Sequence, residues 1–317
     1  MSLARSIVVC SLFLCVFGLP QPADAQAKTA VQRTETKKKA KKPAATFQWV
    51  NTPKQLPAGV THAMFRSSSM DLDVGFCIYL PPAYVKSQGS AKRFPVVYYL
   101  HGGRPGSELK SVKLASAIHS HIVDGSVPDM IYVFVNGGPV SHYNMVERDN
   151  AMGADVFIKE LIPHIDKTYR TIADRQGRAI EGFSQGGRGA TRLAFRYPEL
   201  FCSAAPGGAG HATEKRISEE DGRESNSLVF SEGDNTYDLA RSYAVKKSPS
   251  IALQLHVGTL GFNYENNLAY MKFLDELKIP YTKVIVEGVA HSAAKIYAKS
   301  GLEIMNHHAQ SFTQSVD

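Results

Sequence analysis

Residues 178–187 read Arg-Ala-Ile-Glu-Gly-Phe-Ser-Gln-Gly-Gly, and Gly182, Ser184 and Gly186 fill the pattern G-x-S-x-G. The residues before Gly182 have the pattern of a short strand, and residues 188–197 have that of a helix. A serine in such a strand–turn–helix context is typical of a nucleophile elbow. The turn is sharp, and side chains beside the serine would clash, so glycines flank it on both sides. The sequence therefore predicts Ser184 as a catalytic nucleophile.

A serine hydroxyl needs a general base near neutral pH, and the base needs an orienting acid. In α/β-hydrolases the chain order is serine, acid, histidine. Of the eleven histidines, His291 alone lies between the last expected strand and the final expected helix, which holds His307 and His308. His291 is therefore the predicted base. The acid is expected in the loop 258–265, which holds no Asp and offers Glu265 as its first carboxylate. Glu265 is the candidate acid; the alternative is an acidic residue in a helix's first turn, where the helix dipole favours it.

The oxyanion hole requires two backbone N–H groups that face the developing negative charge. One is expected from Gln185, the residue after the nucleophile. The other is expected from the glycines that follow the apolar run 94–100, with Gly103 favoured and Gly102 its neighbouring candidate. Tyr143 is a candidate substrate-binding residue, although an ordinary surface loop would look the same.

Strand and helix patterns alternate along residues 47–317, as expected for an α/β fold with helices on both faces of the sheet. Residues 209–245 break this rhythm, because they are polar and rich in turn formers. A segment of this kind is either a lid or binding loop or an excursion without a role. The expected strands are 74–80, 94–100, 130–135, 178–181, 201–205, 251–257 and 283–286, and the expected helices are 114–123, 154–169, 188–197, 265–277 and 293–312.

Residues 1–25 have the pattern of a cleavable signal peptide. Arg5 precedes a stretch of thirteen mostly apolar residues, 7–19, and an A-x-A site ends at Ala25. Thirteen residues are too few to span a bilayer as a helix, so a membrane anchor is the weaker interpretation. The protein is therefore expected to be secreted or periplasmic, with cleavage after Ala25.

The positive charge of the chain is concentrated in residues 26–46. This segment carries seven Lys/Arg and one Glu, which accounts for six of the seven net positive charges. It has almost nothing to bury and is expected to be a basic disordered tail or linker. The remaining body is nearly neutral, so the basic pI does not predict a nucleic-acid partner.

Cys77 and Cys202 are the cysteines that remain after the signal peptide. Export would permit a disulfide between them. Cys77 lies in an early strand and Cys202 follows the helix of the elbow, so the two are expected to lie apart in the fold. Two buried free thiols are the prediction.

These features make the chain resemble the esterase D family of α/β-hydrolases, over roughly residues 60–305. The family includes feruloyl and acetyl xylan esterases, S-formylglutathione hydrolase and the mycobacterial mycolyltransferases. The resemblance implies a mostly parallel sheet of about eight strands and a serine ester hydrolase that needs no metal and no cofactor. The motifs that carry it are Leu100-His101-Gly102-Gly103, Glu160-Leu161-Ile162-Pro163, Tyr169-Arg170-Thr171, Ile180 to Gly187, Arg196 to Phe201 and Gly288-Val289-Ala290-His291.

One position departs from the family pattern. The family commonly reads Gly-Thr-x-Asp where this chain has Gly258-Thr259-Leu260-Gly261. The usual acid position is therefore Gly261. The mycolyltransferase branch has a glutamate near this region, which supports Glu265 as the acid.

The sequence thus predicts a secreted serine carboxylic-ester hydrolase that removes acyl or feruloyl groups from carbohydrate esters through an acyl-enzyme on Ser184. The expected partner is a small-molecule or polysaccharide ester, with no nucleic acid and no membrane span. An acyltransferase would use the same groups and is the first alternative. The second is a catalytically weakened carbohydrate-binding relative, because Gly261 occupies the usual acid position.

Overall fold

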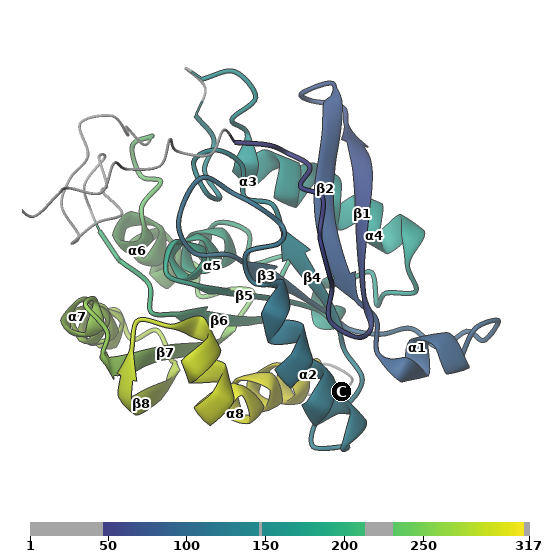
Figure 1. The fold of residues 1–317 in the computed structure, drawn as a ribbon. Coiled ribbons are helices and arrows are strands. Elements are labelled where there is room, and N and C mark those ends of the chain that lie inside the picture. The colour runs from purple at the N-terminus through teal and green to yellow at the C-terminus, as the bar shows by residue number, and fades with distance from the viewer. Residues whose placement is uncertain (1–46, 146–147, 213–230, 314–317) are drawn as a thin grey trace, which may run out of the picture. The chain divides into compact units, whose positions relative to one another are not determined.

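A computed structural model describes residues 47–145, 148–212 and 231–313. Its centre is one sheet of eight strands in the order β1-β2-β4-β3-β5-β6-β7-β8 (Figure 1). The pairs β1–β2 and β2–β4 are antiparallel, and the other neighbouring pairs are parallel. The predicted mostly parallel sheet is thereby confirmed. The strands are β1 Val60–Ser67, β2 Leu72–Tyr79, β3 Val96–Leu100, β4 Ile131–Val135, β5 Arg178–Phe183, β6 Ser203–Gly207, β7 Ala252–Leu260 and β8 Thr282–Ala290.

Helices cover both faces of this sheet (Figure 1). Consecutive side chains of a strand point to opposite faces, so Tyr98 and Tyr99 of β3 enter two different cores. Helices α4 to α7 pack over the Tyr98 face, and α2 and α8 pack over the Tyr99 face. The helices are α1 Pro82–Lys86, α2 Ala115–Val123, α3 Gly153–Asp155, α4 Ile162–Thr168, α5 Gln185–Arg196, α6 Thr236–Lys246, α7 Tyr264–Glu276 and α8 Ala293–Thr313.

The helix expected over 154–169 is divided. A π-helical segment, Val156–Leu161, lies between α3 and α4. Pro163 follows it in the first turn of α4, and its nitrogen has no hydrogen to donate to the preceding turn. The π segment, whose backbone hydrogen bonds span five residues instead of four, therefore lies where Pro163 would interrupt the α-helical hydrogen bonds. The predicted apolar stripe of Phe157, Leu161 and Ile165 is still buried in the core.

The strand β1 was not expected from the sequence. It pairs with β2 from Val60 opposite Tyr79 to Ser67 opposite Leu72. It is an edge strand in which Val60, Phe65 and Ser67 are buried and the residues between them are partly or fully exposed. Its sequence therefore lacks the regular apolar alternation that identifies a half-buried strand.

Part of the segment 209–245 is helical, although no helix was among the elements expected there. Helix α6 begins after Asn235, whose side-chain oxygen accepts hydrogen bonds from the N–H groups of Tyr237 and Asp238. Such an N-cap satisfies donors that have no partner within the helix. Residues 213–230 lie outside the described residues, so the lid stays a prediction. The signal peptide, residues 1–25, and the tail, residues 26–46, lie outside them as well.

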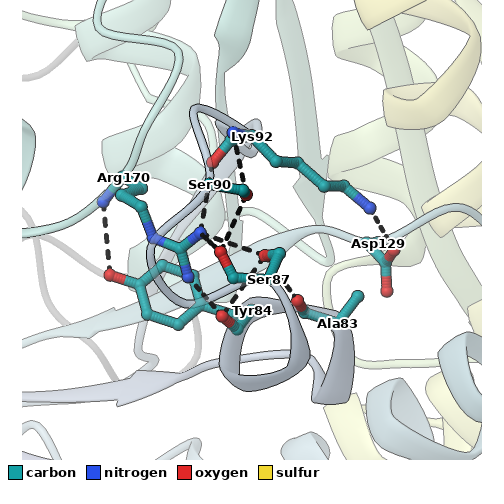
Figure 2. Close-up of polar contacts among 7 residues, drawn as sticks. All are labelled: Ala83, Tyr84, Ser87, Ser90, Lys92, Asp129 and Arg170. Atoms are coloured by element: carbon teal, nitrogen blue, oxygen red, sulfur yellow. Dashed lines mark hydrogen bonds and ion pairs between the residues drawn. The ribbon is translucent and has the colours of Figure 1, made fainter.

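Arg170 anchors the connection between β2 and β3. Its guanidinium donates to the carbonyl oxygen of Ser87 at 2.6 Å and to that of Tyr84, at the end of α1 (Figure 2). Its Cζ also lies 4.2 Å from the centroid of the Tyr84 ring. These contacts satisfy carbonyl groups at the helix end. Since Tyr79 of β2 pairs with Tyr132 at the start of β4, α1 lies at the opposite end of the sheet from the carboxyl end of β5.

Cys77 and Cys202 are buried free thiols, as predicted. Burial raises the pKa of the Cys77 thiol to about 12 and that of the Cys202 thiol to about 11. Both side chains are therefore protonated near neutral pH and pack as small apolar groups. Among the helices of the described residues, none has the length and apolar character needed to cross a membrane.

Candidate active site

Ser184 lies in the turn between β5 and α5. Its backbone has φ 62° and ψ −118°, a region that residues with a side chain rarely adopt. Its N–H donates to the carbonyl oxygen of Gly207 on β6 at 2.8 Å. A Cβ on Gly186 would overlap the carbonyl oxygen of Leu100, and a Cβ on Gly182 would overlap that of Gly186. Both motif glycines are therefore required by the close packing of the elbow against β3.

His291 follows β8 directly and brings its ring to the serine. Its Nε2 lies 2.9 Å from Oγ of Ser184. Burial lowers the pKa of His291 to about 4, so the imidazole is neutral near pH 7. A neutral imidazole at this distance is able to accept the serine proton. The structure thus brings together the two residues that the sequence indicates as nucleophile and base.

The side chain that faces the other ring nitrogen of His291 is Asn263, and not Glu265. Oδ1 of Asn263 lies 3.2 Å from Nδ1 of His291. Asn263 is buried and immediately precedes α7. Glu265 lies two residues further on, exposed, in the first turn of α7. The structure therefore does not bring Glu265 to the histidine. Glu265 lies in the first turn of a helix, which is the alternative that the sequence left open.

The sequence does not point to Asn263, because the third member of a serine triad is normally a carboxylate. Gly261, at the usual acid position, lies close to the histidine, since a Cβ on it would be 3.8 Å from the backbone nitrogen of His291. A glycine has no side chain to offer there. The signal that could have found Asn263 is its amide oxygen in the same loop, because an amide oxygen also accepts a hydrogen bond from an imidazole N–H.

The candidate oxyanion donors lie around the nucleophile. Gln185 is buried at the start of α5, directly after Ser184. A Cβ on Gly102 would lie 3.0 Å from Cβ of Ser184, so the loop after β3 passes against the serine. Gly103 follows with φ 65°, a conformation that favours glycine. The donor role of Gln185 and of either glycine stays a prediction.

The loop after β3 is held in place by the loop after β4. Oγ of Ser141 donates to the carbonyl oxygen of Gly103 at 2.6 Å. The N–H of Gly137 donates to Nε2 of His101 at 3.1 Å, and Nε2 of His142 lies 3.0 Å from the carbonyl oxygen of His101. Burial lowers the pKa of His142 to about 4 and holds that of His101 well below its usual range. Both rings are therefore neutral and serve as fixed hydrogen-bonding groups.

Tyr143 is buried beneath a charged side chain. Cζ of Arg192 lies 3.7 Å from the centroid of the Tyr143 ring, and both residues are buried. Arg192 also donates to the carbonyl oxygens of His142 at 3.1 Å and of Asp234 at 2.8 Å. Tyr143 thus packs in the interior as part of the support for the loop after β4. This position gives no support to the predicted contact with substrate.

Phenylalanine rings lie against the imidazole of His291. The ring centroid of Phe183 lies 4.7 Å from that of His291, and the ring centroid of Phe262 lies 4.2 Å from it. Phe183 is buried, whereas Phe262 is 64% exposed. Leu260, which ends β7 opposite Ala290 of β8, is 67% exposed. The surface next to the histidine is therefore apolar and open to solvent.

This arrangement combines a serine hydroxyl, a neutral base in contact with it and glycine-rich loops beside it. These are the groups that acyl transfer through a covalent serine intermediate requires. Within the described ranges, no three His, Cys, Asp or Glu side chains are grouped so that they could hold a metal ion.

The amino-acid sequence is similar to a family of esterases and to individual esterases. A family model described as "Putative esterase" matches residues 67–270. An endo-1,4-beta-xylanase/feruloyl esterase of Xylanibacter ruminicola is 33% identical over 134 residues, which are 39% of this chain and 18% of that protein. An esterase of Mycobacterium tuberculosis is 29% identical over 149 residues, 44% of this chain and 30% of that protein. The matched segments thus span less than a third of the length of these relatives.

Solved structures share the fold over most of the chain. A ferulic acid esterase superposes with a TM-score of 0.66 at 20% identity, covering 80% of this chain and 98% of that chain. An S-formylglutathione hydrolase of Agrobacterium tumefaciens gives 0.62 at 16% identity, covering 81% and 98%. A fluorophosphonate-binding serine hydrolase of Staphylococcus aureus gives 0.64 at 18% identity, covering 80% and 98%. At these identities the likeness shows the fold, and it confirms the predicted α/β-hydrolase architecture.

Proposed function

We propose that the chain, which belongs to the "Putative esterase" family, is a serine carboxylic-ester hydrolase that forms an acyl-enzyme on Ser184. The observation that carries this proposal is the 2.9 Å contact between Oγ of Ser184 and Nε2 of His291. The strained backbone of Ser184 supports it, because strain of this kind persists where the surrounding structure holds a functional residue in place.

In the acylation half-reaction, Oγ of Ser184 attacks the ester carbonyl carbon while Nε2 of His291 takes the hydroxyl proton. The carbonyl oxygen becomes an oxyanion, which the N–H groups of Gln185 and of Gly103 or Gly102 stabilise. The C–O bond to the alcohol then breaks, and the imidazolium returns its proton to the leaving oxygen. The products of this half-reaction are the free alcohol and an ester of Ser184.

In the deacylation half-reaction, water takes the place of the serine hydroxyl. Nε2 of His291 removes a proton from water, and the resulting hydroxide adds to the carbonyl carbon of the acyl-enzyme. The same N–H groups stabilise the second oxyanion. The bond to Oγ of Ser184 breaks, the serine regains its proton from His291, and the carboxylic acid leaves.

The substrate class we propose is a carbohydrate ester of an acyl or feruloyl group. The relative from Xylanibacter ruminicola is named a feruloyl esterase, and one similar structure is that of a ferulic acid esterase. The exposed ring of Phe262, beside His291, supports this class, because aromatic rings pair favourably with other aromatic groups. An acyl group with a phenolic ring would therefore find a matching surface at the site.

We also propose that the enzyme acts outside the cytoplasm, after removal of residues 1–25. Arg5, the apolar stretch 7–19 and the A-x-A site ending at Ala25 support export. The check is the N-terminal sequence of the protein recovered from the periplasm or medium of an expressing cell. The expected first residue is Gln26, and a protein retained in the cytoplasm with residues 1–25 intact would contradict export.

The function is tested by labelling the protein with a fluorophosphonate probe and locating the label by mass spectrometry. Turnover of p-nitrophenyl acetate and methyl ferulate is measured in parallel. We expect the label on Ser184, and we expect Ser184→Ala or His291→Gln to lower turnover by about 10⁴-fold or more. Val245→Ser, at a position on α6 that is 83% exposed, is the matched control and should change neither result.

The alternatives give different outcomes in the same experiment. A wild-type protein that takes no label at Ser184 and turns over neither ester would be a non-catalytic carbohydrate-binding relative. The observation that favours this alternative is the amide, instead of a carboxylate, at Nδ1 of His291. A labelled protein that passes its acyl group to added alcohols faster than to water would be an acyltransferase.

A further inference from the structure

His291 is contacted by an amide at the place where a Ser-His-Asp triad has a carboxylate. The contact joins Oδ1 of Asn263 to Nδ1 of His291 over 3.2 Å. From it we propose that Asn263 is the positioning residue that holds His291 as the base for Ser184, so that the site works with a neutral third member. This inference rests on the proposed esterase function and concerns the same site.

The orientation of the Asn263 amide is set by a backbone carbonyl. Nδ2 of Asn263 donates to the carbonyl oxygen of Gly208. A carbonyl oxygen accepts only, so the NH₂ end of the amide must face Gly208 and the oxygen end must face His291. Oδ1 therefore accepts the hydrogen on Nδ1 of His291. In the neutral ring this leaves Nε2 without a hydrogen, ready to accept the proton of Ser184 at 2.9 Å.

Gly208 is itself fixed in the structure. Its N–H donates to the carbonyl oxygen of His256 at 2.7 Å, and its φ is 46°. A Cβ at this position would lie 2.7 Å from the ring of Phe183 and 3.5 Å from Cε1 of His291. A residue with a side chain would therefore push against both rings. The glycine allows the backbone to approach the histidine and to present its carbonyl oxygen to Asn263.

Two asparagines of α7 bind the same backbone segment. Nδ2 of Asn267 donates to the carbonyl oxygen of Ala209 at 2.7 Å. Asn266 accepts the N–H of His211 at 2.7 Å and donates to its carbonyl oxygen at 2.8 Å. Side-chain amides thus join the start of α7 to residues 208–211, and Asn263 lies at this junction.

The surroundings of Asn263 match an amide better than a carboxylate. One neighbour is a donor, the Nδ1–H of His291, and the other is an acceptor, the carbonyl oxygen of Gly208. An amide has one group for each, whereas an ionised carboxylate only accepts. In a serine protease triad, replacement of the Asp by Asn lowers kcat by about 10⁴ because the wrong tautomer is selected. Here the carbonyl oxygen of Gly208 turns the amide so that it selects the tautomer of a base.

The amide differs from a carboxylate in charge. Among the residues that the structure describes, Ser184, Asn263, Phe183 and Phe262 contact the His291 ring, and none of these four side chains is charged. Burial lowers the pKa of His291 to about 4, and no acidic side chain in residues 47–145, 148–212 or 231–313 offsets this effect. The base therefore stays deprotonated in mildly acidic solution. The acidic limb of kcat/KM should lie well below the ordinary histidine pKa of about 6.5.

The first test is the pH dependence of kcat and KM in three variants. Asn263→Ala should lower kcat about tenfold or more with little change in KM, because the orienting hydrogen bond is lost. Asn263→Asp should move the acidic limb of kcat/KM upward by about 1 to 3 pH units, because a nearby negative charge favours the imidazolium. Glu276→Gln, an exposed position at the other end of α7, is the control and should leave kcat and the limb unchanged.

A second measurement does not depend on turnover. The side-chain ¹H–¹⁵N spectrum of the histidines reports which ring nitrogen carries the hydrogen, and His291→Gln identifies the signal. At pH 7 we expect the hydrogen on Nδ1 in the wild type and its distribution over both nitrogens in Asn263→Ala. A wild-type protein that shows this tautomer but turns over no ester would refute the proposed function and still support the positioning role.

Three results would overturn the inference. The first is a wild-type spectrum with the hydrogen on Nε2. The second is an Asn263→Ala protein that keeps the wild-type tautomer, kcat and acidic limb. The third is a Glu265→Gln protein that shows the loss of kcat expected for Asn263→Ala, because Glu265 would then be the group that orients His291.

Discussion

His142 donates a hydrogen bond from Nε2 to the carbonyl oxygen of His101 over 3.0 Å. It thereby joins the loop after β4 to the loop that carries Gly102 and Gly103. The direction of the bond follows from the carbonyl oxygen, which can only accept. Ser141, the preceding residue, makes a parallel contact to the carbonyl oxygen of Gly103 at 2.6 Å. The backbone proposed to hold the oxyanion is therefore positioned by a neighbouring loop.

The first prediction concerns this support. Ser141→Ala and His142→Leu should each lower kcat for p-nitrophenyl acetate about tenfold and leave KM nearly unchanged. The reason is that a displaced N–H group is felt mainly in the transition state, when the oxyanion has formed. Steady-state kinetics separate the two constants. Ser141→Thr retains the hydroxyl and should recover most of kcat; a rise in KM at constant kcat would instead indicate a role in substrate binding.

The second prediction concerns the exposed ring beside the base. Phe262→Ser should lower kcat/KM for methyl ferulate about two- to tenfold relative to p-nitrophenyl acetate, because an aromatic pair contributes about 0.5–1.5 kcal/mol. The ratio of the two specificity constants is the measurement, since general damage to the site would lower both. Val245→Ser also replaces an exposed apolar side chain by serine, but on α6, and it should leave the ratio unchanged. An unaltered ratio in Phe262→Ser would remove Phe262 from the substrate surface.

The third prediction separates stability from activity. Arg170→Met should lower the free energy of unfolding by about 2 kcal/mol, because carbonyl groups of Ser87 and Tyr84 lose a charged donor. Its kcat should match that of the wild type at temperatures where both are folded, since α1 lies at the far end of the sheet from the carboxyl end of β5. Urea unfolding and ester turnover give the two quantities. A parallel loss of kcat would show that the two ends of the sheet are coupled.

The fourth prediction concerns a carboxyl group in the core. Glu181 is fully buried, the hydroxyl of Tyr297 contacts its carboxyl oxygens at 2.6 and 2.7 Å, and burial raises its pKa to about 8. Above the unfolded value of about 4.5, the folded protein holds a proton that the unfolded chain has lost. The contribution of the protonated Glu181 carboxyl to stability is therefore fully present below about pH 4.5 and is lost as the pH rises through about 8.

The measurement for Glu181 is the free energy of unfolding at several pH values from 5.5 to 8 in the wild type and in Glu181→Gln. The difference between the two proteins should change by roughly 1.4 kcal/mol for each pH unit up to about pH 7, and by less as the pH approaches 8, in favour of the glutamine variant at higher pH. A difference that stays constant over this range would mean that Glu181 is ionised in the folded protein.

The class of the sheet, Ser184 and His291 were accessible from the amino-acid sequence because each rests on a local signal. The elbow requires Gly182 and Gly186 at fixed positions, since a Cβ at either would overlap backbone carbonyl groups. Buried parallel strands are short apolar runs that end at turn formers. His291 is found by its place after the last of these runs. Such signals remain visible without knowledge of which segments lie side by side.

Edge and interrupted elements were predicted less well. Only some of the side chains of strand β1 are buried, and they do not alternate regularly. Helix α6 begins in a segment rich in turn formers. The π-helical segment before Pro163 has the same apolar stripe as an ordinary helix. In each case the apolar pattern is compatible with more than one structure, and packing against the rest of the sheet selects one of them.

Which side chain contacts Nδ1 of His291 is decided by the tertiary structure. In the sequence Asn263 is one polar residue in a loop, and Glu265 carries the charge that a triad normally uses. In the fold Glu265 faces solvent, while the carbonyl oxygen of Gly208, from the end of β6, turns the amide of Asn263 toward the ring. Tyr143 likewise is an interior residue in the fold, where Arg192 lies over its ring. An amide acquires a direction from the donor and acceptor on its two sides, and here those groups come from segments that only folding brings together.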